Sequence, residues 1–319
     1  MRDQPYGLIC RLRRPHLNRY YGGALRGVPV RRSVDLNTAI PGVLYATSPN
    51  GAAAPLVFDS PHSGTDYPAD FDFVAPRHVV RKAEDSFVDE LFQDAPEYGG
   101  YFQAALFPRS YIDPNRSLQD IDARLLETAW PGPISPSEKT RYGHGLIWRL
   151  CPPNHAMYDR KLGVDEVRRR IDGYWRPYHD LLWDTVSAVT REFGQVWHLN
   201  CHSMPANSAP RGAGDGRPVD IVLGDRDGTT CAPAFTRFVS ETLRGMGYSV
   251  RINDPYKGVE LVRAYSDPKA GRNSLQIEIN RALYMNEVTG ERNGGFDALR
   301  ADMGRLMAAM RDFATVMVA

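Results

Sequence analysis

The chain has 319 residues, of which 42% are hydrophobic, 10% aromatic and 24% charged, and its formal net charge is +1. This is an ordinary globular composition, long enough for one large α/β domain or two smaller ones. The small net charge gives no general attraction to nucleic acid or anionic membranes, and no apolar run reaches the ~18–20 residues of a membrane span.

The first segment of the chain is basic. Residues 1–33 contain eight arginines and one acidic residue, Asp3, with no apolar run of the secretory kind. Serine is too scarce for an organelle transit peptide, and the only aromatic pair that could serve nucleic-acid binding is Tyr20-Tyr21. We therefore expect residues 1–38 to be a disordered basic extension or the product of an upstream start codon, and residues 39–319 to form a single α/β domain.

Short apolar runs alternate with helical periods along the rest of the chain. Strands are predicted at 56–59, 104–107, 196–199, 219–223, 249–252 and 274–280, and helices at 86–95, 165–193, 234–246 and 296–318. Asp85 or Ser86 should cap the first helix, Pro177 should break or kink the second, and Gly247 should cap the third. The alternation predicts a three-layer α/β sandwich with a mixed, mostly parallel central sheet.

Two histidines follow predicted strands in similar contexts, His62 in Ser-Pro-His-Ser-Gly and His202 in Cys-His-Ser-Met-Pro. Ligands of α/β sheets bind beyond the carboxyl ends of the strands. Either histidine alone could be a hydrogen-bonded turn residue. Two histidines with one carboxylate would make a hydrolytic zinc site that leaves one position open for water.

The carboxylate of such a site has several candidates. Asp59 and Asp66 lie near His62 in the sequence, and Glu84 and Asp85 precede the predicted helix at 86–95. Asp85 is attractive because the start of a helix stabilises an anion, although it does so with or without a metal.

The run 274–280 alternates apolar and polar residues, so Gln276, Glu278 and Asn280 share one face. This face could belong to a solvent-exposed edge strand. If it is buried instead, Glu278 could act as the general base for an attacking water.

Cationic residues near these strands could bind a substrate carboxylate. Asn115-Arg116 offers an amide beside a forked cation, and Arg281 directly follows the polar-faced strand. Each arginine could instead form a surface salt bridge.

The four cysteines form no Cys-x-x-Cys pair and are typical of reduced thiols in the cytoplasm. Cys201 next to His202 is a weak signal for a nucleophile, because catalytic Cys and His usually meet in space rather than in sequence.

Seven motifs in order make the chain resemble the N-formylglutamate amidohydrolase (N-formylglutamate deformylase) family from about residue 40 onward. They are FDSPHSG, EDSFVDELF, RSYIDPNR, HLNCHSMP, DIVLGDRDG, PYKGVELVRAYSDP and SLQIEINRALYM. The resemblance extends distantly to zinc carboxypeptidases and aspartoacylases. It implies that His62, His202 and Asp85 are metal ligands, that Glu278 is the general base, and that Asn115-Arg116 clamps a carboxylate. The carboxypeptidase His-x-x-Glu pattern is absent, and Pro114 stands where relatives more often have leucine.

The resemblance also implies a function, which is metal-dependent hydrolysis of N-formyl-L-glutamate to L-glutamate and formate in histidine degradation. The cofactor would be Zn²⁺ or another divalent metal, and the partner a small anionic substrate. The residues alone predict only a metal-assisted amide hydrolase acting on an anionic small molecule. Alternatives are a zinc amidohydrolase for another N-acyl amino acid or anionic amide, and a non-catalytic carboxylate-binding protein.

Overall fold

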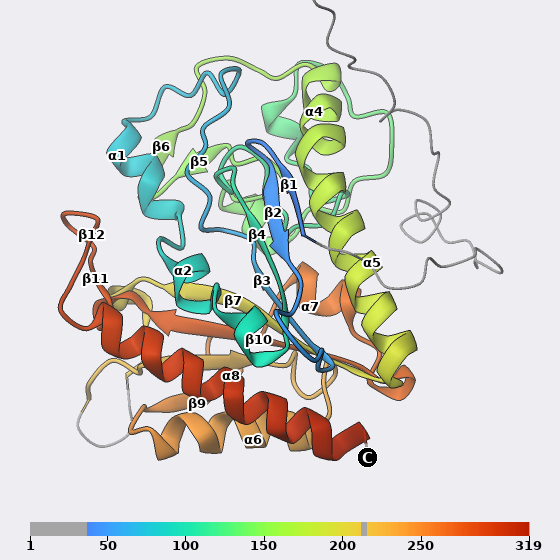
Figure 1. The fold of residues 1–319 in the computed structure, drawn as a ribbon. Coiled ribbons are helices and arrows are strands. Elements are labelled where there is room, and N and C mark those ends of the chain that lie inside the picture. The colour runs from blue at the N-terminus through green and yellow to red at the C-terminus, as the bar shows by residue number, and fades with distance from the viewer. Residues whose placement is uncertain (1–36, 212–215, 319) are drawn as a thin grey trace, which may run out of the picture. The chain divides into compact units, whose positions relative to one another are not determined.

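An eight-stranded mixed sheet forms the centre of the fold (Figure 1). The computed structural model describes residues 37–211 and 216–318. The strand order is β1-β2-β4-β3-β7-β10-β8-β9, with bounds β1 Thr38–Ile40, β2 Leu44–Thr47, β3 Leu56–Ser60, β4 Tyr101–Ala105, β7 Val196–Met204, β8 Ile221–Gly224, β9 Val250–Ile252 and β10 Arg272–Asn280. The four central strands β4, β3, β7 and β10 are parallel, β1, β2 and β8 join antiparallel, and β9 runs parallel to β8. The predicted mixed, mostly parallel sheet is confirmed.

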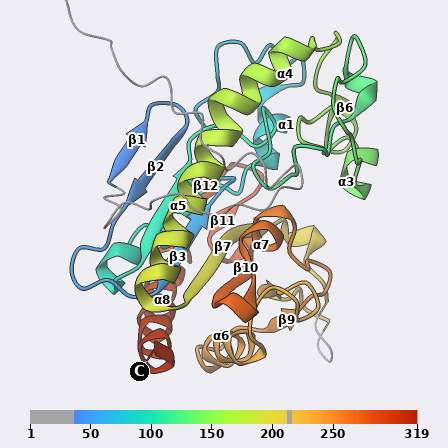
Figure 2. The same ribbon diagram turned by 90° about the vertical axis from the view of Figure 1, so that its right-hand side faces the viewer.

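Helices cover both faces of the sheet, which confirms the predicted three-layer sandwich (Figures 1 and 2). One face packs against α2 (Val88–Phe92), α6 (Pro233–Gly245) and α8 (Phe296–Val318), and the other against α5 (Arg176–Phe193) and α7 (Glu260–Tyr265). The remaining α-helices and the two small hairpins are α1 Arg77–Val80, α3 Glu138–Arg141, α4 Val164–Arg170, β5 Leu150–Cys151 with β6 His155–Ala156, and β11 Met285–Asn286 with β12 Glu291–Arg292. No helix in the described part of the chain could cross a membrane.

The two faces of the sheet differ in chemistry. Leu275, Ile277 and Ile279 of β10 point into a large apolar core that also contains Met303 and Met310 of α8. The opposite face of the same strands carries polar side chains that are nevertheless buried: Asp59, Gln103, His198, Asn200, His202, Ser274, Gln276, Glu278 and Asn280. Since β10 lies between β7 and β8, the solvent-exposed edge strand is not what the structure shows.

The polar face also explains the error in the predicted end of β7. The sequence predicts that this strand ends at residue 199, but it continues to Met204, so His202 lies inside the strand rather than after it. Each of these buried polar side chains has at least one hydrogen-bond partner, which offsets much of the usual cost of burying it. Another correction concerns α2, whose N-cap is Phe87 in a left-handed conformation (φ 66°) instead of Asp85 or Ser86.

The long helix predicted at 165–193 forms as three joined pieces, which are α4, a π-helical turn at Ile171–Trp175, and α5. Pro177 lies at the start of α5, directly after the π turn. Proline cannot donate to the turn before it and clashes with the carbonyl four residues back, so the wider π turn lets the helix continue past it. The predicted break is therefore a change of helical pitch.

Residues 37–211 and 216–318 all belong to one compact unit of the chain. Most of the predicted basic extension lies outside the described residues. Thr38, which was assigned to that extension, lies in β1 and pairs with Ala46.

Candidate active site

Three predicted metal ligands converge at the carboxyl end of β3. His62 follows β3, His202 lies near the end of the adjacent parallel strand β7, and Asp85 lies before α2. Asp85 Oδ2 is 3.4 Å from His62 Nδ1 and 3.0 Å from His202 Nδ1, and the two ring centroids are 4.7 Å apart. All three side chains are almost completely buried. Among the described residues they make the one group of three or more such side chains whose ligand atoms all lie within 4.8 Å of one another.

Local backbone contacts bring His62 and Asp85 together. The Asp85 N–H donates to the His62 carbonyl (2.9 Å), and the Ser63 hydroxyl donates to the Asp85 carbonyl (2.9 Å). A Cβ on Gly64 would lie 2.3 Å from the Leu106 carbonyl carbon, so this chain crossing requires glycine. The Pro-His-Ser-Gly turn thus holds His62 against the segment that carries Asp85.

Hydrogen bonds fix which nitrogen of His62 carries its proton. His62 Nε2 is 2.8 Å from Asp113 Oδ1. Burial would raise the pKa of Asp113, but the guanidinium groups of Arg109 and Arg116 hold it well below its usual range, so this carboxylate is an acceptor. Nε2 therefore carries the hydrogen, and the lone pair of Nδ1 faces Asp85. His62 Nδ1 is buried without a hydrogen-bond partner in the described structure.

His202 has the same orientation. Its Nε2 is 2.7 Å from Asn200 Oδ1, and its Nδ1 faces Asp85 Oδ2. Two imidazole lone pairs and a carboxylate oxygen, aimed at one another without a hydrogen between them, form a donor set that fits a divalent cation such as zinc. The three residues fit a metal of this kind.

Glu278 lies beside the three candidate ligands His62, Asp85 and His202, which we call the metal-ligand cluster. In the register of β10 and β7, Glu278 pairs with His202, so the two side chains project from the same face of adjacent strands. Gln276 Nε2 donates to Glu278 Oε1 (2.9 Å). Burial, together with the charge of Asp85, raises the pKa of Glu278 to about 7. A carboxylate with this pKa can accept and return a proton near neutral pH.

Asn115 and Arg116 form a rigid wall of the site. Asn115 Oδ1 accepts the Leu261 N–H (2.9 Å), which turns its Nδ2 toward His202 Nε2 at 3.2 Å. Arg116 donates from Nε to the His144 carbonyl and from Nη1 to the Asn115 carbonyl, both at 2.8 Å. In the described part of the chain no acceptor bonds Arg116 Nη2, which leaves that nitrogen for a ligand.

Buried side chains from the helix α4–π–α5 hold the loop that bears these residues. Arg170 donates to the Tyr111 carbonyl (3.0 Å) and Trp175 donates to the Arg116 carbonyl (3.0 Å). His179 Nε2 donates to the Pro114 carbonyl (2.7 Å), while its Nδ1 accepts from the Tyr265 hydroxyl (2.7 Å) and its ring stacks on Trp175.

Arg281 reaches the same site but uses each of its nitrogens within the protein. It donates to Ser203 Oγ from Nε, to the Lys82 carbonyl from Nη1 and to Asp85 Oδ1 from Nη2, each at 3.0 Å. These contacts hold Asp85 in place. Substrate binding by Arg281 stays a prediction, and the observed contacts support a positioning role.

Comparison with known proteins places the whole site within one family. The family model of N-formylglutamate amidohydrolase matches residues 54–285, a span that includes every site residue described above. The chain belongs to the N-formylglutamate amidohydrolase family. A solved N-formylglutamate amidohydrolase from Ralstonia eutropha JMP134 is 49% identical, with a TM-score of 0.82, and the match covers 86% of this chain and 99% of that one.

More distant relatives agree with this assignment. The chain is 28% identical over 238 residues to an N-formylglutamate deformylase from Pseudomonas aeruginosa and 28% identical over 240 residues to one from Pseudomonas putida. Each match covers 73% of this chain and 83% of the relative. A solved protein from Agrobacterium tumefaciens, gene product Atu2144, shares the fold at 18% identity, with a TM-score of 0.57 over 84% of this chain and 96% of that one.

Two cationic residues near the site of this N-formylglutamate amidohydrolase family member, Arg109 and Lys139, were not predicted from the sequence. Arg109 donates from Nε and Nη2 to Asp113 Oδ2, while its Nη1 makes no hydrogen bond in the described structure and lies 3.8 Å from Asp85 Oδ1. Lys139 is an exposed residue of α3, and partial desolvation together with the charges of Arg116 and Arg109 lowers its pKa. No ion pair joins Lys139 to a carboxylate in the described part of the chain. Arg109 stands in the motif RSYIDPNR, but only the fold shows that it faces the metal-ligand cluster.

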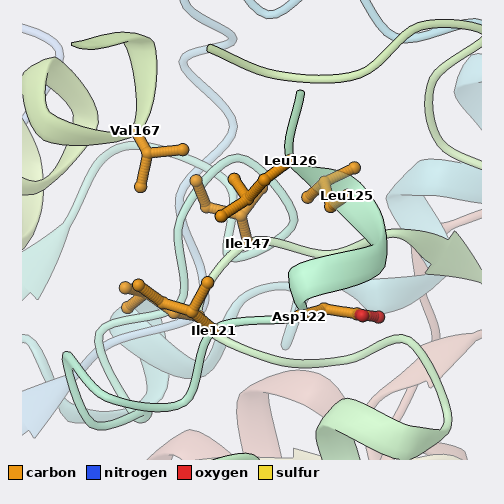
Figure 3. Close-up of a pocket in the computed structure, with 7 residues that line it drawn as sticks. Ile121, Asp122, Leu125, Leu126, Ile147 and Val167 are labelled. Atoms are coloured by element: carbon orange, nitrogen blue, oxygen red, sulfur yellow. The ribbon is translucent and has the colours of Figure 1, made fainter. Parts of the chain in front are cut away.

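A hollow elsewhere in the molecule is lined mainly by apolar side chains and contains none of the three candidate metal ligands. Figure 3 shows the side chains that line it: Ile121, Asp122, Leu125, Leu126, Leu146, Ile147 and Val167. The carboxylate of Asp122 accepts hydrogen bonds from Arg124 and Arg149, and the other lining side chains are apolar. The hollow shares no residue with the metal-ligand cluster.

Proposed function

We propose that this chain is a metal-dependent amidohydrolase that converts N-formyl-L-glutamate to L-glutamate and formate. The observation that carries the proposal is the convergence of His62, His202 and Asp85 beside Glu278 in a member of the N-formylglutamate amidohydrolase family. The names of the relatives support this substrate. A cytoplasmic location is part of the proposal, because Cys151, Cys201 and Cys231 are all free thiols, as expected in a reducing compartment.

Zinc is the metal that best suits two imidazole nitrogens and one carboxylate oxygen, although Mn²⁺, Fe²⁺ or Co²⁺ would accept the same ligands. When bound, such an ion polarises the carbonyl oxygen of the scissile amide and lowers the pKa of water. His62, His202 and Asp85 would hold it, and Asp113, Asn200 and Arg281 would orient those ligands.

Glu278 is the proposed general base. It removes a proton from the attacking water as the water oxygen bonds to the formyl carbon. The protonated Glu278 then delivers that proton to the amide nitrogen as the carbon–nitrogen bond breaks, which releases glutamate with a free amino group and formic acid, whose remaining proton is lost to solvent to give formate. Arg109 Nη1, unused and close to Asp85, is placed to donate to the negative charge that develops on the carbonyl oxygen.

The substrate carries two carboxylates, which calls for two cations. Arg116 is the proposed reader of the α-carboxylate, because Asn115 beside it contacts His202 and because its Nη2 is open to a ligand. Lys139 is the proposed reader of the side-chain carboxylate. It lies close enough to Arg109 and Arg116 for their charges to lower its pKa, and it has no acidic partner within ion-pair distance among the described residues.

Metal removal combined with a substrate panel tests this function. The purified protein should release formate from N-formyl-L-glutamate, lose that activity after chelation, and regain it when Zn²⁺ is added back. N-acetyl-L-glutamate and N-formyl-L-norvaline, which change the acyl group and the side-chain charge separately, should be much poorer substrates. Full activity in protein shown to be metal-free would contradict the metal's role, and faster hydrolysis of N-acetyl-L-glutamate would contradict the proposed substrate.

A further inference from the structure

The metal-ligand cluster rests on a second group of buried polar side chains, deeper on the same face of the sheet. Asp59 Oδ1 accepts from Asn200 Nδ2 and from His198 Nε2, both at 2.8 Å, and Asp59 Oδ2 accepts from the Tyr178 hydroxyl at 2.6 Å. His198 Nδ1 in turn is 2.7 Å from Ser274 Oγ. All five side chains are completely buried, so none of them can touch a substrate.

Asp59 determines how the Asn200 amide is turned. The register of β3 and β7 places the two residues side by side on adjacent strands. Burial alone would raise the pKa of Asp59, but the hydrogen bonds from His198, Tyr178 and Asn200 lower it below its ordinary value. An ionised carboxylate only accepts hydrogen bonds, so the group facing Asp59 must be the Asn200 NH₂. The Asn200 carbonyl oxygen then faces His202.

The direction of that carbonyl determines the tautomer of His202. Asn200 Oδ1 can only accept, and at 2.7 Å it lies closer to His202 Nε2 than the Asn115 NH₂ group does at 3.2 Å, so the hydrogen of the neutral ring lies on Nε2, toward Asn200. In the neutral ring the lone pair is then on Nδ1, the nitrogen that faces Asp85. With the Asn200 amide turned the other way, Nε2 would face only NH₂ groups, those of Asn200 and Asn115. The ring proton would then move to Nδ1, and Nδ1 could not bind a metal until it lost that proton.

We infer that Asp59 is a positioning residue for the metal site, which acts through Asn200 to hold His202 in the tautomer that leaves Nδ1 free. This inference rests on the proposed function, because it assumes that His202 is a metal ligand. The two histidines differ in this respect. His62 Nε2 donates directly to the carboxylate of Asp113, whereas His202 Nε2 donates to the amide oxygen of Asn200, which is itself oriented by the Asp59 carboxylate.

The test measures the Zn²⁺ affinity of the metal-free protein by competition with a coloured chelator. Loss of a group that orients a metal ligand typically weakens affinity ~10- to 100-fold, and Asp59→Asn should do so. Tyr178→Phe is the matched control, because it removes one hydrogen bond to the same carboxylate without touching Asn200. It should leave the affinity within about threefold of wild type, since Asn200 keeps its acceptor.

The exchanged variant Asp59→Asn/Asn200→Asp separates orientation from loss of fold. The amide introduced at position 59 would donate to the carboxylate introduced at position 200, and that carboxylate would accept from His202 Nε2, while His198 changes tautomer and donates to Ser274. The exchange should restore most of the Zn²⁺ affinity lost in the single variant. Affinity as low as in Asp59→Asn, or an Asp59→Asn protein that binds Zn²⁺ like wild type, would overturn the inference. A wild-type protein that binds no Zn²⁺ would instead contradict the proposed function.

A measurement on the wild-type protein tests the tautomer of His202 directly. In Zn²⁺-loaded protein with ¹⁵N-labelled histidine, long-range proton–nitrogen correlation should show His202 protonated at Nε2 and coordinated at Nδ1. The His202 signal is assigned by its absence in His202→Gln. Coordination through Nε2 would overturn the inference.

Discussion

Replacing His179 by a residue that does not titrate should reduce the loss of unfolding free energy at acidic pH. His179 is buried, stacks on Trp175, and donates to the Pro114 carbonyl beside Asn115 and Arg116. Burial lowers the pKa of His179 to about 3, against ~6.5 in an unfolded chain. Between those pH values His179 is protonated in the unfolded chain but not in the folded protein. The contribution of His179 to the free energy of unfolding is therefore fully present above pH ~6.5 and decreases as the pH falls toward 3.

The size of the effect follows from the shift. Each pH unit between the two pKa values costs ~1.4 kcal/mol of unfolding free energy, so lowering the pH from 7.5 to 5 should cost ~2 kcal/mol through His179 alone. His179→Gln keeps an N–H for the Pro114 carbonyl but has no proton to gain. The wild type should therefore lose ~2 kcal/mol more than the variant between these two pH values.

Urea unfolding followed by tryptophan fluorescence, with a chelator present, measures both proteins at pH 7.5 and pH 5. The other titrating groups are common to the two chains, so their contributions cancel in the difference. If wild type and His179→Gln lose the same unfolding free energy, the assigned burial or the neutral state of His179 is wrong.

Four further predictions concern catalysis and metal binding. His202→Ala should lower bound metal to well below one equivalent without unfolding the chain, and a full equivalent of tightly bound metal would exclude His202 as a ligand. Glu278→Gln should lower kcat ~10²–10⁴-fold at unchanged metal content, while activity within about twofold of wild type would mean that another group accepts the proton. Arg116→Lys should lower kcat/KM for N-formylglutamate ~30- to 5,000-fold but much less for a neutral formamide, and equal losses on both would make Arg116 structural. Lys139→Gln should raise KM for N-formylglutamate roughly tenfold, the value of one charged hydrogen bond, and leave N-formylglutamine unchanged. The same rise for both substrates would rule out a contact to the side-chain carboxylate.

Much of the fold could be predicted from hydrophobic periodicity. The apolar period of α8 and the alternation of β10 were both strong enough to place these elements, including the face that carries Glu278. The continuation of β7 through His202 could not be predicted, because a buried strand with alternating polar residues looks like a strand that has ended. The edge strand β1 could not be predicted either, because its three residues are all exposed to solvent and therefore show no alternation of apolar and polar side chains.

The candidate ligands could be predicted because each lies at or near the end of a predicted element. Their supporting contacts could not, since they join residues far apart in the sequence. Asp113 lies 51 residues from His62, and Asn115 lies 146 residues from Leu261. The occupied donors of Arg281 likewise depend on Lys82 and Asp85, almost 200 residues away. Residue types therefore indicated which groups could act, and only the folded chain indicates which remain free to do so.

The π turn at Ile171–Trp175 sets the rotation of α4 about its axis relative to α5. A π turn closes over five residues where an α turn closes over four, and its smaller rotation per residue offsets the additional residue, so deleting one residue from this turn would restore ordinary pitch with little rotation of the segment before it. Arg170 would then still face the Tyr111 carbonyl, and Trp175 and His179 could keep their own contacts. The π turn thus takes up one residue of helix length without moving either end of the loop that bears Asn115 and Arg116, whereas a one-residue deletion in α5 between Trp175 and His179 would rotate Arg170 relative to His179 by ~100°.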